Sequence, residues 1–211
     1  MILVCCPLIA LHQVLHTPNL QFDIHQITTN PTGKLLAIAG AYQVAVVVLP
    51  RAGYSKLVST SIDCKYARVI LGISRAKCSL RSVQVGQFYH GSRDSAPIAK
   101  IEWHPWGEAG STLMVMTTDG RLRFVRALHF SKPLTVTREY DISVDTEEPQ
   151  QVLSFFPEKK SKSFMAEDPA EREIASFTLG KGKADWGPLT VHAVTRSGDV
   201  YAICPYMPQN A

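Results

Sequence analysis

Histidines and cysteines are the residues of this chain that could carry chemistry. Seven histidines are spread over the 211 residues. His12 and His16 stand four apart, but the carboxylate of an H-E-x-x-H zinc motif is missing between them. The other histidines do not cluster with carboxylates at any ligand spacing. We therefore predict no catalytic residue, no metal site and no bound cofactor.

The motifs of nucleotide and acyl-transfer chemistry are also missing. Two glycine-rich stretches, 107–112 and 180–187, lack the G-x-x-x-x-G-K-[ST] spacing that cradles a phosphate. The sequence holds no G-x-S-x-G turn for a serine nucleophile. The sequence therefore predicts a protein that is not an enzyme.

The composition fits a soluble globular domain in a reducing compartment. Hydrophobic residues make up 45% of the chain and charged residues 19%, and the net charge of +4 is scattered rather than gathered on one face. The odd number of cysteines and the lack of a C-x-x-C pair favour reduced core thiols; they are Cys5, Cys6, Cys64, Cys78 and Cys204. The apolar start lacks the basic segment of a secretory signal, and Pro7 interrupts it, so we expect neither a signal peptide nor a membrane span. Because the basic residues are scattered, we expect no direct contact with nucleic acid.

The tetrapeptide Trp103-His104-Pro105-Trp106 has two interpretations. A buried tryptophan followed by a His-Pro turn would close a strand, and the same place in the other repeat units holds Asn30-Pro31 and Phe156-Pro157. The alternative is an exposed aromatic hot spot for a partner protein. We favour the buried tryptophan and the turn.

The elements that surround these residues repeat three times. Each unit has an apolar strand that ends in a proline turn, a second that ends at glycine, and a third apolar strand. The units comprise 24–31, 35–40 and 44–50, then 98–105, 112–120 and 121–127, then 150–157, 188–198 and 199–205. Short strands that cannot bury their own apolar faces must stack on their neighbours, which is typical of a β-propeller.

The pattern predicts an all-β fold, an incomplete WD40-like β-propeller of about three to four blades from a seven-bladed ring. Residues 1–21 form an N-terminal segment and 22–211 the propeller. Asp119-Gly120 between two apolar runs predicts a tight hairpin. Outer strands are expected at 82–90 and at 134–142, where the second would complete the second blade.

An insertion at 158–187 is expected to interrupt the third unit and to contain a short helix at about 169–179. Asp168 would cap this helix, Pro169 fits its first turn, and Gly180 would end it. Ile174 and Phe177 would then share one face. This face either packs on its own propeller or binds a partner, and we name Ile174 and Phe177 as the candidate partner-binding residues.

The order of these motifs resembles the N-terminal propeller of the eighty-two-kilodalton fungal nucleoporin, whose metazoan counterpart is the eighty-eight-kilodalton nucleoporin. The resemblance runs from about Phe22 to Pro208 and rests on the following stretches: NPTGKLLAIAG, VAVVVLP, VGQFYH, IAKIEWHPWGE, TLMVMTTDGRLR, the insertion, and GDVYAICPYMP. The Gly-His and Trp-Asp signatures of true WD40 repeats are absent from the sequence.

The resemblance implies a non-catalytic structural nucleoporin on the cytoplasmic face of the nuclear pore complex. Its partners would be the peptide tail of a cytoplasmic-filament nucleoporin and the C-terminal domain of a phenylalanine-glycine-repeat nucleoporin, and its role would be in mRNA export and nucleocytoplasmic transport. Seven blades need about 300 residues, so we expect the chain to be part of a longer protein. A generic propeller adaptor for protein–protein interaction is the alternative.

Overall fold

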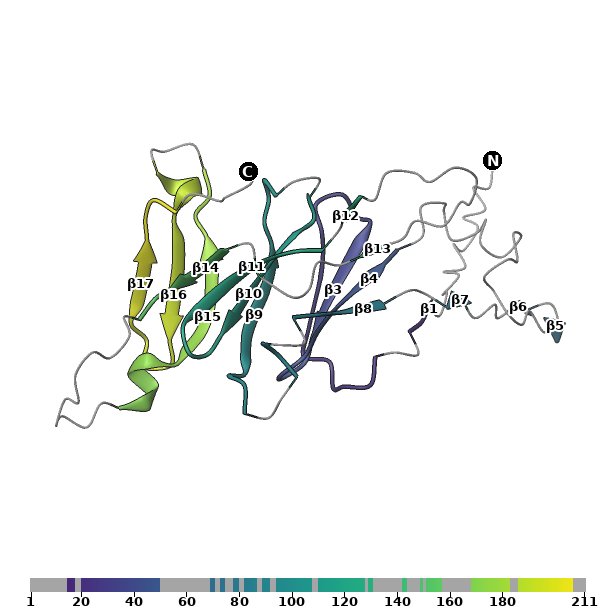
Figure 1. The fold of residues 1–211 in the computed structure, drawn as a ribbon, viewed down its shortest axis with the longest axis horizontal. Coiled ribbons are helices and arrows are strands. Elements are labelled where there is room, and N and C mark those ends of the chain that lie inside the picture. Colours follow the sequence, from purple (N-terminus) through teal and green to yellow (C-terminus); the bar gives the residue numbers. More distant parts are fainter. Residues whose placement is uncertain are drawn as a thin grey trace, which may run out of the picture.

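The fold is a row of antiparallel β-sheets, shown by a computed structural model (Figure 1). The structure describes residues 15–17, 20–49, 69–70, 73–74, 78–79, 82–86, 89–91, 94–107, 110–127, 129–130, 142–143, 149, 151–156, 168–182 and 186–206. Three main sheets follow one another along the longest axis, in the order of the sequence. We call them the first, second and third blade.

In the described residues the first two blades have four strands each and the third has three, all antiparallel to their neighbours. The first blade consists of β2 (Gln26–Thr29), β3 (Leu35–Ala39), β4 (Val44–Val48) and β8 (Ser82–Val85). The second consists of β9 (Ile98–Trp103), β10 (Thr112–Thr117), β11 (Arg121–Arg126) and β14 (Gln151–Ser154). The third consists of β15 (Ile174–Leu179), β16 (Val191–Thr195) and β17 (Val200–Ile203).

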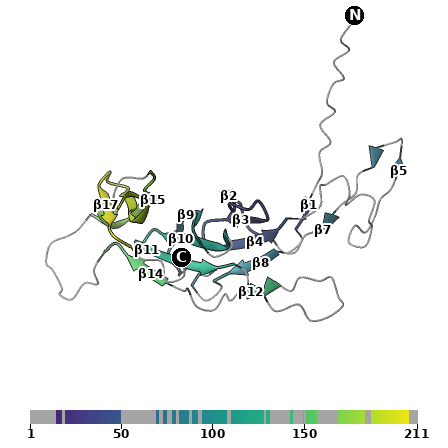
Figure 2. The same ribbon diagram turned by 90° about the horizontal axis from the view of Figure 1, so that it is seen from above.

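The remaining elements are short. Three two-residue pairs flank the blades: β1 (Leu15–His16) with β7 (Cys78–Ser79), β5 (Val69–Ile70) with β6 (Ile73–Ser74), and β12 (His129–Phe130) with β13 (Ile142–Ser143). Two 3-10 turns, η2 (Pro169–Arg172) and η3 (Gly187–Leu189), precede β15 and β16. Seen from above, the blades stand side by side without closing into a ring (Figure 2). The fold is thus an incomplete β-propeller.

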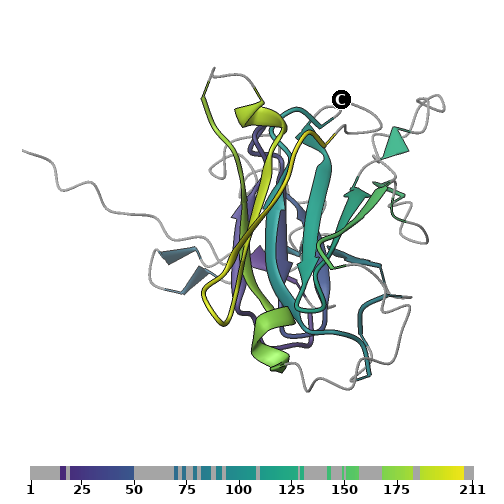
Figure 3. The ribbon, with the colours of Figure 1, turned by 90° about the vertical axis from the view of Figure 1, so that its left-hand side faces the viewer.

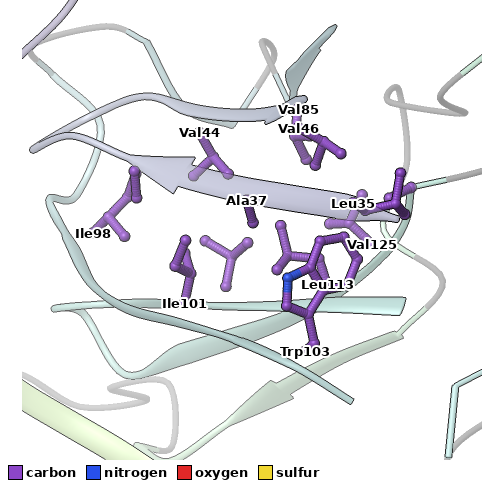
Figure 4. Close-up of a cluster of buried hydrophobic side chains, with 13 residues drawn as sticks. Leu35, Ala37, Val44, Val46, Val85, Ile98, Ile101, Trp103, Leu113 and Val125 are labelled. Atoms are coloured by element: carbon purple, nitrogen blue, oxygen red, sulfur yellow. The ribbon is translucent and has the colours of Figure 1, made fainter. Parts of the chain in front are cut away.

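The stacking of blades explains why the sequences of the inner strands are continuous apolar runs. All six residues of β10 are buried, because the two faces of this strand meet different blades. Leu113 and Val115 join the core between the first and second blades, where Trp103 also lies (Figure 4). Met114 and Met116 join the core between the second and third blades. The two-residue alternation of a strand is present, but both of its faces are apolar.

The predicted hairpin at Asp119-Gly120 is confirmed. β10 and β11 pair across it, and Gly120 has a φ of 81°. A Cβ added at Gly120 would lie 2.5 Å from the Phe156 ring. The outer strand expected at 82–90 is also confirmed for Ser82–Val85, which pair with β4.

The predicted helix at 169–179 is wrong. Asp168 caps only the single turn η2, by accepting the backbone N–H of Ala170 at 2.9 Å, and the strand β15 follows at once. A register shift between Ile174 and Ser176 places a bulge in β15. Because a bulge adds one residue to a strand, Ile174 and Phe177 face the same side at a spacing that resembles a helix.

The assignment of strands to the third unit also needs correction. Residues 151–154 form β14, which pairs with β11 as the fourth strand of the second blade, so they do not open the third blade. The opening strand is β15, and 158–187 is therefore not an insertion between the third blade's first and second strands. The outer strand expected at 134–142 lies, except for its last residue, outside the described residues, as does most of the 1–21 segment.

Candidate functional site: the junctions between the blades

The first strands of neighbouring blades are joined by hydrogen bonds from a side chain of one strand to the backbone of the first strand in the next blade. The Gln26 amide donates to the carbonyl of Ala99 at 2.8 Å and accepts the N–H of Ile101 at 3.0 Å. Lys100 stands at the matching place in β9, and its Nζ donates to the carbonyl of Phe177 at 2.6 Å. These bonds link the first strands of adjacent blades through a side chain, where two neighbouring strands of one sheet would be linked by a backbone ladder.

Asn30 and His104 hold the same position in successive blades, directly after the first strand. The backbone N–H of Asn30 donates to Leu35 and that of His104 to Thr112, both at 2.9 Å. The Asn30 side chain is 4% exposed and makes four hydrogen bonds. It donates to Thr32 and to the Gly110 carbonyl of the second blade, and accepts the N–H groups of Lys34 and Leu35. Every polar atom of this buried amide is thereby satisfied.

His104 joins the second blade to the chain that follows the third. Its Nδ1 accepts the backbone N–H of Trp106 at 3.1 Å, so the neutral ring carries its proton on Nε2 and donates it to the hydroxyl of Tyr206 at 2.7 Å. Burial lowers the pKa of His104 and raises the pKa of Tyr206 to about 12. Both groups are held neutral and in a structural role. The structure supports the interpretation of a buried Trp103 followed by a turn at His104-Pro105, in which His104 is buried and Pro105 is exposed.

The two tryptophans near His104 differ in their exposure to solvent. Trp103 is 5% exposed, and its indole N–H donates to the carbonyl of Thr28 in the first blade at 3.1 Å. Trp106 is 47% exposed. The aromatic hot-spot alternative thus survives for Trp106 alone.

The corresponding position in the third blade is Gly180, whose N–H donates to Thr190 at 2.8 Å. Glycine carries no side chain that could reach a further blade, and a Cβ here would lie 1.9 Å from the carbonyl oxygen of Gly187. The third blade therefore lacks the side-chain bridge that the first two share.

The candidate partner-binding residues lie in the core. Ile174 is 0% exposed and Phe177 is 2% exposed, and both pack between the second and third blades with Met114 and Phe124. They form no exposed stripe, and of the two expectations for this face, packing on its own propeller is the one that the structure supports.

One buried polar cluster had no signal in the sequence. His90 is 2% exposed, and among the described residues its two ring nitrogens have no hydrogen-bond partner. The guanidinium of Arg123 stands 5.4 Å from the ring centre of Tyr89 and donates to the Thr117 hydroxyl at 3.0 Å. Burial, with the positive charge of Arg123 as a lesser cause, lowers the pKa of His90 to about 4. His90, in the segment between β8 and β9, is thus a buried and neutral histidine.

In the described part of the chain, no three histidine, cysteine or carboxylate side chains come together as a metal site, and no helix has the length and apolarity to cross a membrane. Cys204 is an exposed free thiol, so the expectation of a core position is wrong for this cysteine. Cys78 lies in β7, and Cys5, Cys6 and Cys64 fall outside the described residues.

Comparison with known proteins decides the family. The model of the nucleoporin NUP82 β-propeller matches residues 10–210. The chain belongs to this family. Nucleoporin nup82 of Schizosaccharomyces pombe is 24% identical to this NUP82-type propeller over 208 residues, which are 95% of the chain and 24% of the relative. The Arabidopsis thaliana nuclear pore complex protein NUP88 is 25% identical over 194 residues, 90% of the chain and 19% of that protein.

A solved structure shows the same fold. It is the Chaetomium thermophilum heterotrimer of the Nup82 N-terminal domain, the Nup159 tail and the Nup145N APD, and one of its chains matches with a TM-score of 0.60 at 20% identity. The match covers 89% of the NUP82-type propeller and 32% of that chain. The chain spans about a fifth to a quarter of the length of the curated relatives that it matches.

Proposed function

We propose that this chain is a non-catalytic structural part of a nucleoporin, one that docks other nucleoporins on the cytoplasmic face of the nuclear pore complex. The observation that carries the proposal is the match of the NUP82 propeller family over residues 10–210. Because the relatives are about four times as long, the chain would contribute one part of their docking surface.

The junction chemistry supports a scaffold rather than an enzyme. Polar side chains at the junctions form hydrogen bonds between neighbouring elements. Gln26 and Asn30 bond to backbone groups of the second blade, and His104 bonds to the Tyr206 hydroxyl. These hydrogen bonds hold neighbouring blades in a fixed arrangement, which is what a docking platform needs.

The partners we propose are the peptide tail of a cytoplasmic-filament nucleoporin and the C-terminal domain of a phenylalanine-glycine-repeat nucleoporin. The solved Chaetomium complex, which holds a Nup159 tail and a Nup145N domain, motivates this choice. The role would be to place mRNA export factors at the pore, without direct binding of nucleic acid or insertion into a membrane.

A chimera tests the proposed function. The segment of S. pombe nup82 that matches this chain is replaced by residues 10–210 and fused to a fluorescent protein. We expect fluorescence at the nuclear rim and normal export of polyadenylated RNA. A chimera in which the matching segment is deleted is the control for rim signal that comes from the remainder of nup82. If the exchanged chimera is stable but diffuse in the cytosol, the generic adaptor replaces the nucleoporin proposal.

A further inference from the structure

We draw no further inference here: the strongest candidate, the exposed side chains of Trp106 and Trp186 in the turns that lead into β10 and into β16 of the third blade, the blade nearest the viewer in Figure 3, is apolar surface, and nothing in the structure shows what covers it.

Discussion

The imidazole Nε2 of His104 lies 2.7 Å from the hydroxyl of Tyr206, 102 residues further along the chain, and both side chains are buried. The bond joins the end of β9 to the segment that follows β17. Asn30 makes the corresponding connection one blade earlier, to the carbonyl of Gly110. The same position of the repeat thus connects successive blades with two different side chains.

Tyr206→Phe should destabilise the chain. Without the hydroxyl, the Nε2 proton of His104 has no acceptor in a buried site, which costs about 1–3 kcal/mol. Tyr201→Phe is the matched control, since Tyr201 is 37% exposed and its ring packs on Phe156. Urea unfolding at pH 8 measures both variants. Equal stabilities of the two would show that the hydrogen bond contributes nothing.

Stability should fall in mild acid because of His90. Its pKa is about 4 in the folded chain against an ordinary value of 6.5, so the unfolded chain binds more protons between these values. The stabilisation is complete above about pH 6.5 and is lost as the pH falls towards 4, and it amounts to about 3 kcal/mol at most. His104, whose pKa burial also lowers, adds to the loss in the same direction.

His90→Gln isolates this contribution. Glutamine does not titrate, so the difference in unfolding free energy between pH 7.5 and pH 5 should be smaller in the variant than in the wild type. The comparison uses each protein as its own reference, which removes the cost of the substitution itself. An unchanged difference would exclude His90 as a source of the pH dependence.

The sequence was sufficient to predict the strands that carry apolar runs and turn residues. Gly120 and the Asn30-Pro31 turn marked the ends of β10 and β2 because both residue types act locally. The sequence could not locate β14, since only pairing with β11 distinguishes an outer strand from the first strand of the next blade. Local signals do not contain that information.

The site was harder to predict for a similar reason. Helical spacing at Ile174 and Phe177 came from a bulge, which is a property of the pairing with β16. The contact of His104 with Tyr206 and the burial of His90 both depend on segments brought together only by the stack of blades. A histidine in a single sequence gives no sign of which distant hydroxyl it will meet.

Two hairpin glycines allow the crowding at Gly120 to be separated from its backbone strain. Gly120 and Gly198 have positive φ values of 81° and 100°, so alanine costs about 1–2 kcal/mol of conformational strain at each. A Cβ at Gly120 also meets the Phe156 ring at 2.5 Å, whereas one at Gly198 meets nothing within 4 Å. Gly120→Ala should therefore lower the melting temperature more than Gly198→Ala. Equal losses would mean that the Phe156 ring moves aside freely.

Phe177 tests the assignment of β15 to the core. The side chain is 2% exposed between the second and third blades, and its carbonyl accepts the Lys100 ammonium. Phe177→Ala leaves a cavity and should cost about 3–5 kcal/mol. Thr178→Ala changes the exposed neighbour on the same strand and should cost less than 1 kcal/mol. Thermal unfolding of both variants gives the comparison. A Phe177→Ala protein that melts like the Thr178→Ala protein would place Phe177 at the surface after all, and would restore its candidacy as a partner-binding residue.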